Sequence, residues 1–196
     1  MEPMKEIFKK LGSFFLDTIQ TVVLALSIFV VVYLFLLQPH QVKGNSMHPN
    51  FQNNEFLLTD KISYRFGEPQ RGDVIVFKAP SSEPCAADEC EYIKRIIALP
   101  NERVKIENNH IFIDGRRLVE NYLDESLKTS PGDIFQGGGE ITVPPETYLV
   151  LGDNRPYSRD GREFGFIERE AILGKAWFRY WPFTQIGLIP KANYNI

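Results

Sequence analysis

A serine and a lysine, in two separate short motifs, are the residues of this sequence whose side chains could combine into a catalytic pair. Ser46 lies in the turn-forming segment 44–49 (GNSMHP), which favours an exposed hydroxyl. A serine hydroxyl is a weak nucleophile and needs a base beside it. The histidines are poor candidates for this base, since His48 is too close to Ser46 in sequence. His40 borders a long apolar run, and His110 follows a predicted hairpin turn.

Lys94 is the candidate base, because it interrupts the apolar, strand-like run Tyr92–Pro100 (YIKRIIALP). Successive strand residues point to opposite faces, so either Lys94 or Arg95 must face the more buried side. Arginine is hard to deprotonate, whereas burial can tune the pKa of lysine. An ordinary lysine is neutral in roughly one molecule of two thousand at pH 7, and an effective base needs a pKa of about 7–8. Desolvation among neighbours such as Ile93 and Ile96 can lower the pKa this far, which corresponds to about 4 kcal/mol.

A third motif, Gly152–Arg162 (GDNRPYSRDGR), supplies further polar side chains. Ser158 could hydrogen-bond the lysine amine and orient it, as the third member of a triad. The segment Arg71–Phe77 (RGDVIVF) is typical of a turn that enters a strand. Each motif taken alone has an ordinary structural explanation, as a turn or as a lysine that reaches solvent. Their order along one chain, behind an apolar N-terminal run, favours a site built on Ser46 and Lys94.

The apolar run Thr18–Leu37 (TIQTVVLALSIFVVVYLFLL) contains no charged residue. A helix that crosses the hydrocarbon core of a bilayer needs about 20 such residues. The run is longer than the apolar core of a cleaved signal peptide, and no small-x-small cleavage site follows it. We therefore predict an uncleaved transmembrane helix over 18–37, after a short cytoplasmic segment over 1–17. A cleaved signal peptide and a buried helix of a soluble protein are the alternatives.

The positive charges around this run predict its orientation. Lys5, Lys9 and Lys10 precede it, and only Lys43 follows closely. Lysine and arginine are enriched on the cytoplasmic side of membrane spans. The N-terminus should therefore lie in the cytoplasm, and the domain of residues 38–196 on the outer side of the membrane.

The composition of the 196-residue chain narrows the possible function classes. A formal net charge of -3 argues against a nucleic-acid-binding protein. H-E-x-x-H, Walker A and G-x-G-x-x-G motifs are absent from the sequence. Three histidines and two cysteines cannot fill several metal sites. These absences remove the main support for zincin, P-loop and Rossmann functions, and the Ser/Lys interpretation of the motifs implies neither a metal nor a small-molecule cofactor.

Residues 38–196 predict an all-β, mostly antiparallel domain, since short β-type runs recur between turn signals. The expected strands are Glu55–Tyr64, Asp73–Phe77, Tyr92–Ala98, Arg103–Glu107, His110–Ile113, Ile141–Val143, Tyr148–Leu151 and Leu173–Tyr180. Asn108-Asn109 favours a hairpin turn, because asparagine tolerates positive φ. Phe166–Leu173 is expected as a short helix or turn. Polar surface loops are expected near 81–90 and 124–140.

Cys85 and Cys90 lie in the first of these loops. In a domain outside the cytoplasm, a local disulfide between them is expected. Free thiols and a metal-binding or redox pair are the alternatives.

Together, the four motifs and the segment 141–155 (ITVPPETYLVLGDNR) resemble those of bacterial type I signal peptidases, the membrane-anchored Ser/Lys endopeptidases of the S26 family. The resemblance extends from the apolar run to about Ile189. It implies a signal-peptidase-like β catalytic domain behind one transmembrane helix. In that domain Ser46 forms an acyl-enzyme, Lys94 is the general base, and Ser158 orients Lys94. The supporting residues that it implies, through ion pairs and hydrogen bonds, are Arg95, Asp153, Asp160 and Arg162.

The resemblance also implies how the substrate is bound. Signal peptides of preproteins would be cut after a small-x-small motif held in two shallow apolar pockets, with the extended substrate paired to strand edges. The backbone N–H of Ser46 would contribute to the oxyanion hole. Gly44 stands where some members have a serine hydroxyl, so backbone donors carry more of this role, and Gly161 stands where many members have serine. The implied pocket walls are Val42, Met47, Phe51 and Ile93.

The location implied by the resemblance is the bacterial inner, or cytoplasmic, membrane, with the lipid bilayer as a partner and the secretion translocon nearby. Aromatic residues of Trp177–Phe183 would rest on lipid or, alternatively, pack in the core. Alternative functions are a specialised conjugation- or pilus-associated processing peptidase, a LexA-like self-cleaving repressor, and a membrane-tethered domain that binds peptides without cutting them. The anchor and the lack of a helix-turn-helix pattern count against the repressor. Intact Ser46, Lys94 and Ser158 count against the domain that only binds.

Overall fold

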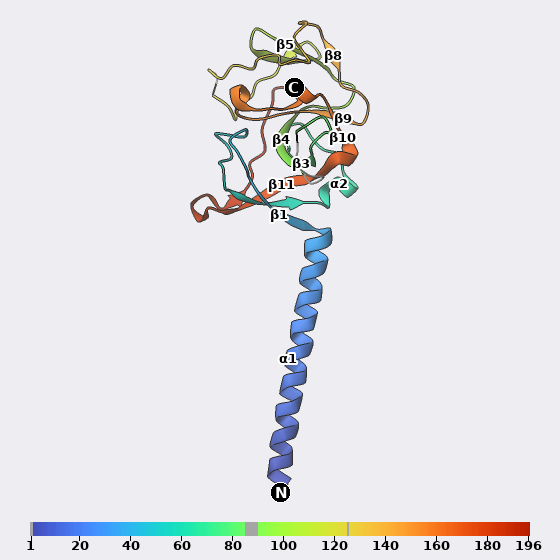
Figure 1. Ribbon diagram of the computed structural model, residues 1–196, viewed down its shortest axis with the longest axis vertical. Coiled ribbons are helices and arrows are strands. Elements are labelled where there is room, and N and C mark those ends of the chain that lie inside the picture. Colours follow the sequence, from blue (N-terminus) through green and yellow to red (C-terminus); the bar gives the residue numbers. More distant parts are fainter. Residues whose placement is uncertain (1, 85–89, 125) are drawn as a thin grey trace. The chain divides into compact units, whose positions relative to one another are not determined.

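The computed structural model describes residues 2–84, 90–124 and 126–196. The chain divides between Gln38 and Pro39 into two compact units. Helix α1 (Glu2–Phe35) makes up most of the first unit and is continuous in Figure 1. Its stretch Lys9–Tyr33, 25 residues long, is apolar and lies outside the protein interior. This stretch is long and apolar enough to cross a membrane.

Helix α1 extends well beyond the predicted span, since it begins at Glu2 rather than Thr18. A single charged residue such as Asp17 ends an apolar run but does not end a helix. At 1.5 Å per residue the helix is about 51 Å long, so it exceeds a hydrocarbon core of about 30 Å. Leu37 already belongs to strand β1 (Leu37–Gln41), where Pro39 disfavours helical backbone before it.

The second unit is built from two β-sheets, and every strand pair with a defined register is antiparallel. The larger sheet contains, in spatial order, β1, β2 (Phe56–Asp60), β11 (Ile172–Trp181), β3 (Val74–Lys78), β4 (Glu91–Ala98), β9 (Thr147–Leu151) and β10 (Ile167–Glu168), with β12 (Gly187–Leu188) also paired to β11. The smaller sheet contains β7 (Arg116–Arg117), β6 (His110–Ile113), β5 (Arg103–Glu107) and β8 (Ile141–Thr142). These sheets confirm the predicted mostly antiparallel β fold behind one N-terminal apolar helix.

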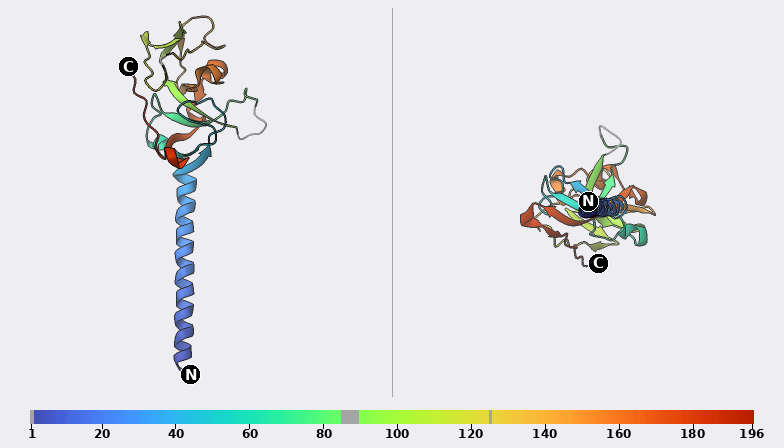
Figure 2. Two further views of the ribbon diagram at one scale, coloured as in Figure 1. Left: turned by 90° about the vertical axis from the view of Figure 1, so that its left-hand side faces the viewer. Right: turned by 90° about the horizontal axis from the view of Figure 1, so that it is seen from below.

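The smaller sheet and β11 lie at opposite ends of the second unit in Figure 1. The chain that follows β12 returns along the outside of the domain to the smaller sheet, as Figure 2 shows. There Asn195 accepts a hydrogen bond from Val119 N over 2.9 Å and donates one to Arg117 O over 3.0 Å. The C-terminal segment therefore ties the two sheets together.

The predicted hairpin is present between β5 and β6, with Glu107 paired to His110. Asn108 and Asn109 have φ values of 50° and 65°, the left-handed region that a tight hairpin turn requires. The region 166–173, expected as a short helix or turn, contains β10 followed by the 3₁₀ turn η2 (Arg169–Ala171).

Two predicted elements need correction. The strand expected over Glu55–Tyr64 ends at Asp60, where the Asp60 carboxylate accepts hydrogen bonds from the backbone N–H groups of Ile62 and Ser63 at 2.8 and 3.0 Å and turns the chain away from the strand. Helix α2 (Ser63–Phe66) follows this turn. The predicted surface loops also contribute buried side chains to the domain. These buried residues are Glu83, Thr129 and Phe135.

One of the hydrophobic clusters lies under the segment that carries Ser46. It joins residues that follow α1 to the central strands β2, β3 and β11. Its buried members are Val42, Met47, Phe51, Leu57, Val74 and Ala176, with Ile93 packed against them. The other two clusters fill the space around β4 and β9 and between the sheets. Burial of this apolar surface fixes the strands on which the polar motifs lie.

Candidate active site

Ser46 and Lys94 meet in the structure although 48 positions separate them. Lys94 Nζ donates a hydrogen bond to Ser46 Oγ over 2.8 Å and another to Ile93 O over 3.1 Å. Lys94 lies in a central strand, where it pairs with Ile75 of β3. The lysine is therefore held on a rigid element, with its amine within proton-transfer distance of the serine hydroxyl.

The turn that carries Ser46 is held from two sides. Inside the turn, His48 N donates to Asn45 O over 3.1 Å. From the 152–162 loop, Asn154 N donates to Ser46 O over 3.0 Å, and Asn154 Nδ2 donates to Asn45 O over 2.9 Å. These bonds leave the Ser46 backbone little freedom relative to the loop.

Both basic residues at the centre of β4 are buried, with 4% of Lys94 and 3% of Arg95 exposed. The strand alternation predicted one buried side chain, but the sheet is covered on both faces here. Arg95 donates to the two carboxylate oxygens of Asp153 over 2.9 and 2.7 Å, so its charge is neutralised by a bidentate ion pair. Charge pairs of this geometry keep arginine protonated at any physiological pH. Lys94 is left as the basic group of β4 that can lose a proton.

Burial lowers the pKa of Lys94 to about 8, and the negative charges of Asp160, Asp153 and Glu83 oppose this effect. At pH 7 a group with this pKa is neutral in about one molecule of ten. The neutral fraction is thus roughly two hundred times that of an ordinary lysine. The physical cause is the loss of water around an ammonium group, which disfavours the charged form.

The predicted supporting acids brace the loop beside the pair Ser46 and Lys94, called the dyad below. Asp160 accepts hydrogen bonds from Arg162 Nε and Nη2, both over 2.8 Å. Its Oδ2 atom also accepts the Gly152 N–H over 3.0 Å, which closes the loop onto itself. Asp153 accepts a further bond from Asn50 Nδ2 over 2.9 Å, so it links the loop to the segment after Ser46.

Ser158 lies in this loop and is buried, but its Oγ atom has no hydrogen-bond partner in the part of the chain that the structure describes. The predicted bond from Ser158 to Lys94 therefore stays a prediction. A Cβ atom at Gly152 would lie 2.1 Å from Ser158 Oγ and 2.4 Å from Ser46 O. Only glycine at position 152 lets the Ser158 side chain and the Ser46 carbonyl lie this close to the backbone of residue 152.

Arg155 and Glu120 are further residues of this region that were not among the site residues expected from the sequence. Arg155 is buried and forms an ion pair with Glu120, and it also donates to Thr129 Oγ1 over 2.7 Å. The ion pair fastens the 152–162 loop to the segment that follows β7. Arg155 belongs to the GDNR motif, whereas Glu120 gives no sequence signal, because its partner is 35 positions away.

The predicted pocket walls are close together but mostly inaccessible in the free protein. Val42, Met47 and Phe51 are buried core residues, and Ile93 is partly exposed beside them. They pack beneath the segment that carries Ser46. Their contact with a substrate remains a prediction.

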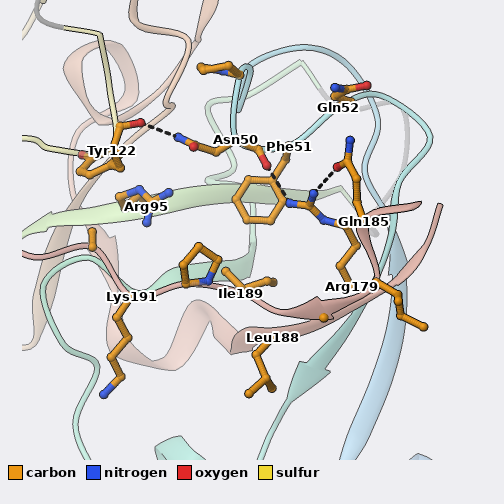
Figure 3. Close-up of a pocket in the computed structure, with 15 residues that line it drawn as sticks. Asn50, Phe51, Gln52, Arg95, Tyr122, Arg179, Gln185, Leu188, Ile189 and Lys191 are labelled. Atoms are coloured by element: carbon orange, nitrogen blue, oxygen red, sulfur yellow. Dashed lines mark hydrogen bonds between the residues drawn. The ribbon is translucent and has the colours of Figure 1, made fainter. Parts of the chain in front are cut away.

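A separate cavity of about 450 Å³ lies between the segment 49–52 and the C-terminal segment 185–192. Figure 3 shows Arg95, Tyr122 and Arg179 around it, with Asn50 Nδ2 donating to Tyr122 O over 3.1 Å. Arg179 Nη2 donates to Asn50 O over 2.7 Å. Ser46 and Lys94 do not line this cavity, so it is distinct from the dyad.

Two expectations about the periphery stay predictions. Trp177 and Trp181 are partly exposed and Phe183 is exposed, whereas Tyr180 of the same segment is partly buried and packs on Phe56, so the lipid contact expected for this segment stays a prediction. The disulfide expected between Cys85 and Cys90 stays a prediction, because Cys85 lies outside the described residues.

Comparisons with known proteins agree with these observations. Residues 15–181 match the family model described as signal peptidase, peptidase S26. Signal peptidase IB of Staphylococcus aureus is 33% identical over 191 residues, which cover 92% of this chain and 94% of the relative. Probable signal peptidase I-2 of Synechocystis sp. is 35% identical over 170 residues, which cover 87% and 75%.

A crystal structure of a signal peptidase I from Enterococcus faecalis V583 is 32% identical, with a TM-score of 0.44 over 56% of this chain and 97% of that chain. The family match spans most of the present chain, and signal peptidase IB of Staphylococcus aureus is matched over 94% of its length. The chain therefore belongs to the S26 signal peptidase family, and it is a peptidase whose N-terminal apolar helix is compatible with membrane anchoring.

Proposed function

We propose that this protein is a membrane-bound serine endopeptidase that removes N-terminal signal peptides from exported preproteins by cutting after a small-x-small motif. The observation that carries the proposal is the 2.8 Å contact between Ser46 Oγ and the buried amine of Lys94. Family membership supports a peptidase, and this contact supplies both a nucleophile and a base for it.

The reaction begins with neutral Lys94. Its amine takes the proton of Ser46 as Oγ attacks the scissile carbonyl, and the resulting oxyanion is stabilised by backbone donors that include the Ser46 N–H. Collapse of this intermediate breaks the peptide bond, and the Lys94 ammonium gives its proton to the leaving amine. An ester on Ser46 remains. Water then attacks the ester carbonyl while Lys94 takes a proton from the water. The bond between the carbonyl carbon and Ser46 Oγ breaks, and the Lys94 ammonium returns the proton to Ser46 Oγ.

Substrate selection rests on the apolar surroundings of Ser46. Val42, Met47 and Phe51 fill the space beneath the turn, and Ile93 flanks the lysine. Shallow apolar pockets over this layer accept only small side chains, which is the small-x-small pattern of cleavage sites. The extended substrate adds to a strand edge through main-chain hydrogen bonds.

The membrane anchors the enzyme near its substrates. Three lysines before the apolar run and one after it favour a cytoplasmic N-terminus and a catalytic domain on the outer side of the inner, or cytoplasmic, bacterial membrane. Exposed Trp177, Trp181 and Phe183 fit contact with the lipid surface, since tryptophan prefers membrane interfaces. A position near the secretion translocon would give the enzyme access to emerging preproteins.

The test is cleavage of a purified preprotein by the full chain in detergent or lipid. Wild type should release a mature protein whose new N-terminus, mapped by mass spectrometry, follows a small-x-small motif. Ser46→Ala and Lys94→Ala should abolish the cut, and so should Lys94→Arg, because an arginine cannot serve as a neutral base. The matched control is Lys105→Ala, which removes a lysine paired with Glu107 on the surface.

Wild-type activity in a folded Ser46→Ala or Lys94→Ala variant would reject the dyad. A folded wild type that cuts no general preprotein would instead favour a specialised processing peptidase of the same chemistry.

A further inference from the structure

Glu83 is a buried acid beside the dyad that the proposed reaction does not use. It lies after β3, where a surface loop was expected, yet its side chain is 0% exposed. Its carboxylate accepts a hydrogen bond from the Tyr92 hydroxyl over 3.0 Å. Both carboxylate oxygens also accept a hydrogen bond from Arg159 Nε, over 2.9 and 2.8 Å. A buried carboxylate keeps its charge only when it has such partners.

Both partners of Glu83 adjoin residues of the site. Tyr92 precedes Lys94 by two positions on β4, and the centre of its ring lies 5.3 Å from Lys94 Nζ. Arg159 directly follows Ser158 in the 152–162 loop. One carboxylate thus connects its own segment with β4 and the 152–162 loop, the two elements that carry Lys94 and Ser158.

The charges around Lys94 give Glu83 a second effect. The acids that act on Lys94 are Asp160 and Asp153 from the loop and Glu83 from the segment after β3. The two loop acids are each paired with a buried arginine. The counter-ion of Glu83 is the half-exposed Arg159. Burial, together with the hydrogen bond to Glu83 and its negative charge, raises the pKa of Tyr92, so this ring stays a neutral neighbour of Lys94.

We propose that Glu83 is a positioning residue of this active site, which holds Tyr92 and the 152–162 loop against Lys94 and sets the charge that the amine senses. This inference rests on the proposed Ser46/Lys94 chemistry. It predicts that removing the carboxylate changes both the rate and its pH dependence, whereas a purely structural contact would change stability alone.

The test compares pH–rate profiles of the full chain on a preprotein. Glu83→Gln keeps the shape and removes the charge, so protonated Lys94 loses a favourable neighbour. The acidic limb of kcat/KM, which reports the protonation of Lys94, should move to lower pH by roughly half a unit to one unit. A fall in kcat with little change in KM should accompany this shift, because the site remains formed but is less well aligned.

Arg159→Gln removes the counter-ion and keeps the carboxylate, so the acidic limb should move in the opposite direction, to higher pH. The matched control is Arg103→Gln. The Arg103 side chain is 54% exposed, against 55% for Arg159, and it pairs with Asp114 and Glu140 on the smaller sheet. This control should leave the profile unchanged.

The inference would be overturned if the acidic limb of the kcat/KM profile stays in place in both variants, or if it moves in the same direction in both. If Glu83→Gln fails to fold, Arg159→Gln alone decides, since an unmoved acidic limb in that variant also rejects the positioning role. Failure of the proposed function is distinguishable, because it would appear as wild-type enzyme that does not depend on Ser46, whatever the profile of the Glu83 variant.

Discussion

The buried amine of Lys94 should make the wild-type enzyme less stable than an inactive variant in which this amine is replaced by an apolar group. We predict that Lys94→Met, which replaces the lysine by an unbranched apolar side chain, abolishes cleavage and raises the free energy of unfolding at pH 7. Methionine fills irregular space in cores and needs no hydrogen-bond partner. The reason for the gain is that the folded enzyme holds a charged group away from water.

The magnitude follows from the two pKa values. Lowering the lysine pKa from 10.5 to about 8 means that the folded state is disfavoured by about 3 kcal/mol at pH 7, where both states are mostly protonated. The variant loses the bonds to Ser46 and Ile93, worth about 1 kcal/mol each. The net stabilisation should therefore be about 1–3 kcal/mol, a large share of the stability of an ordinary domain.

The pH dependence has a definite sign. Between pH 8 and 10.5 the unfolded lysine binds more protons than the folded one, so the stability of wild type rises with pH across this window. Lys94→Met lacks this rise. Its advantage over wild type should shrink by about 2 kcal/mol between pH 7 and pH 9.5.

The assay is urea unfolding of the full chain in detergent, followed by tryptophan fluorescence. The sequence contains two tryptophans, Trp177 and Trp181, and both lie in β11, so the signal reports the catalytic domain. Lys105→Met is the control, because this lysine lies at the surface and its replacement should change stability by less than about 0.5 kcal/mol. A Lys94→Met variant that unfolds no later than wild type, with a difference that does not vary with pH, would refute the desolvation argument.

Three further predictions concern the same site. Below pH 8, kcat/KM should fall about tenfold per pH unit as Lys94 becomes protonated, and a profile flat from pH 6 to 8 would contradict this. Gly152→Ala should abolish cleavage, because its Cβ would displace Ser46, while the circular dichroism spectrum remains that of a β protein. Full activity in this variant would show that the close contact of residue 152 with Ser46 is not needed. Arg155→Met should destabilise the domain by about 3–5 kcal/mol in urea unfolding, because it leaves the mostly buried Glu120 carboxylate without its charged partner. A smaller loss in Arg155→Met would mean that water reaches Glu120.

Local features of the sequence predicted the parts of the fold that depend on near neighbours. The Asn108-Asn109 hairpin is one case, since two residues decide the turn and the flanking alternation decides the strands. The contact between Ser46 and Lys94 spans 48 positions, so it could be predicted only from the order of the motifs along the chain and from the family resemblance. The strand around Asp60 is shorter than predicted because the Asp60 carboxylate binds the backbone N–H groups of Ile62 and Ser63 and forms a turn.

The ion pair between Glu83 and Arg159 could not be predicted from the sequence. Glu83 and Arg159 lie 76 positions apart, and each taken alone is a typical surface residue of a polar loop. Burial of Glu83 becomes apparent only when its two partners are known. Arg95 and Asp153, which lie 58 positions apart, were expected as supporting residues only through the family resemblance, because neither residue signals the other locally.

The sequence separations within the site bear on when this protease becomes active during its own synthesis. Ser46 emerges early, but the groups that hold it include Asn154, whose side chain reaches back 109 positions to Asn45. In the proposed mechanism, a growing chain carries Ser46 for a long interval before the 152–162 loop can pack against it, because contacts of this span form late in folding. Cleavage activity should therefore appear only after the segment that contains Asn154 has been synthesised and has folded.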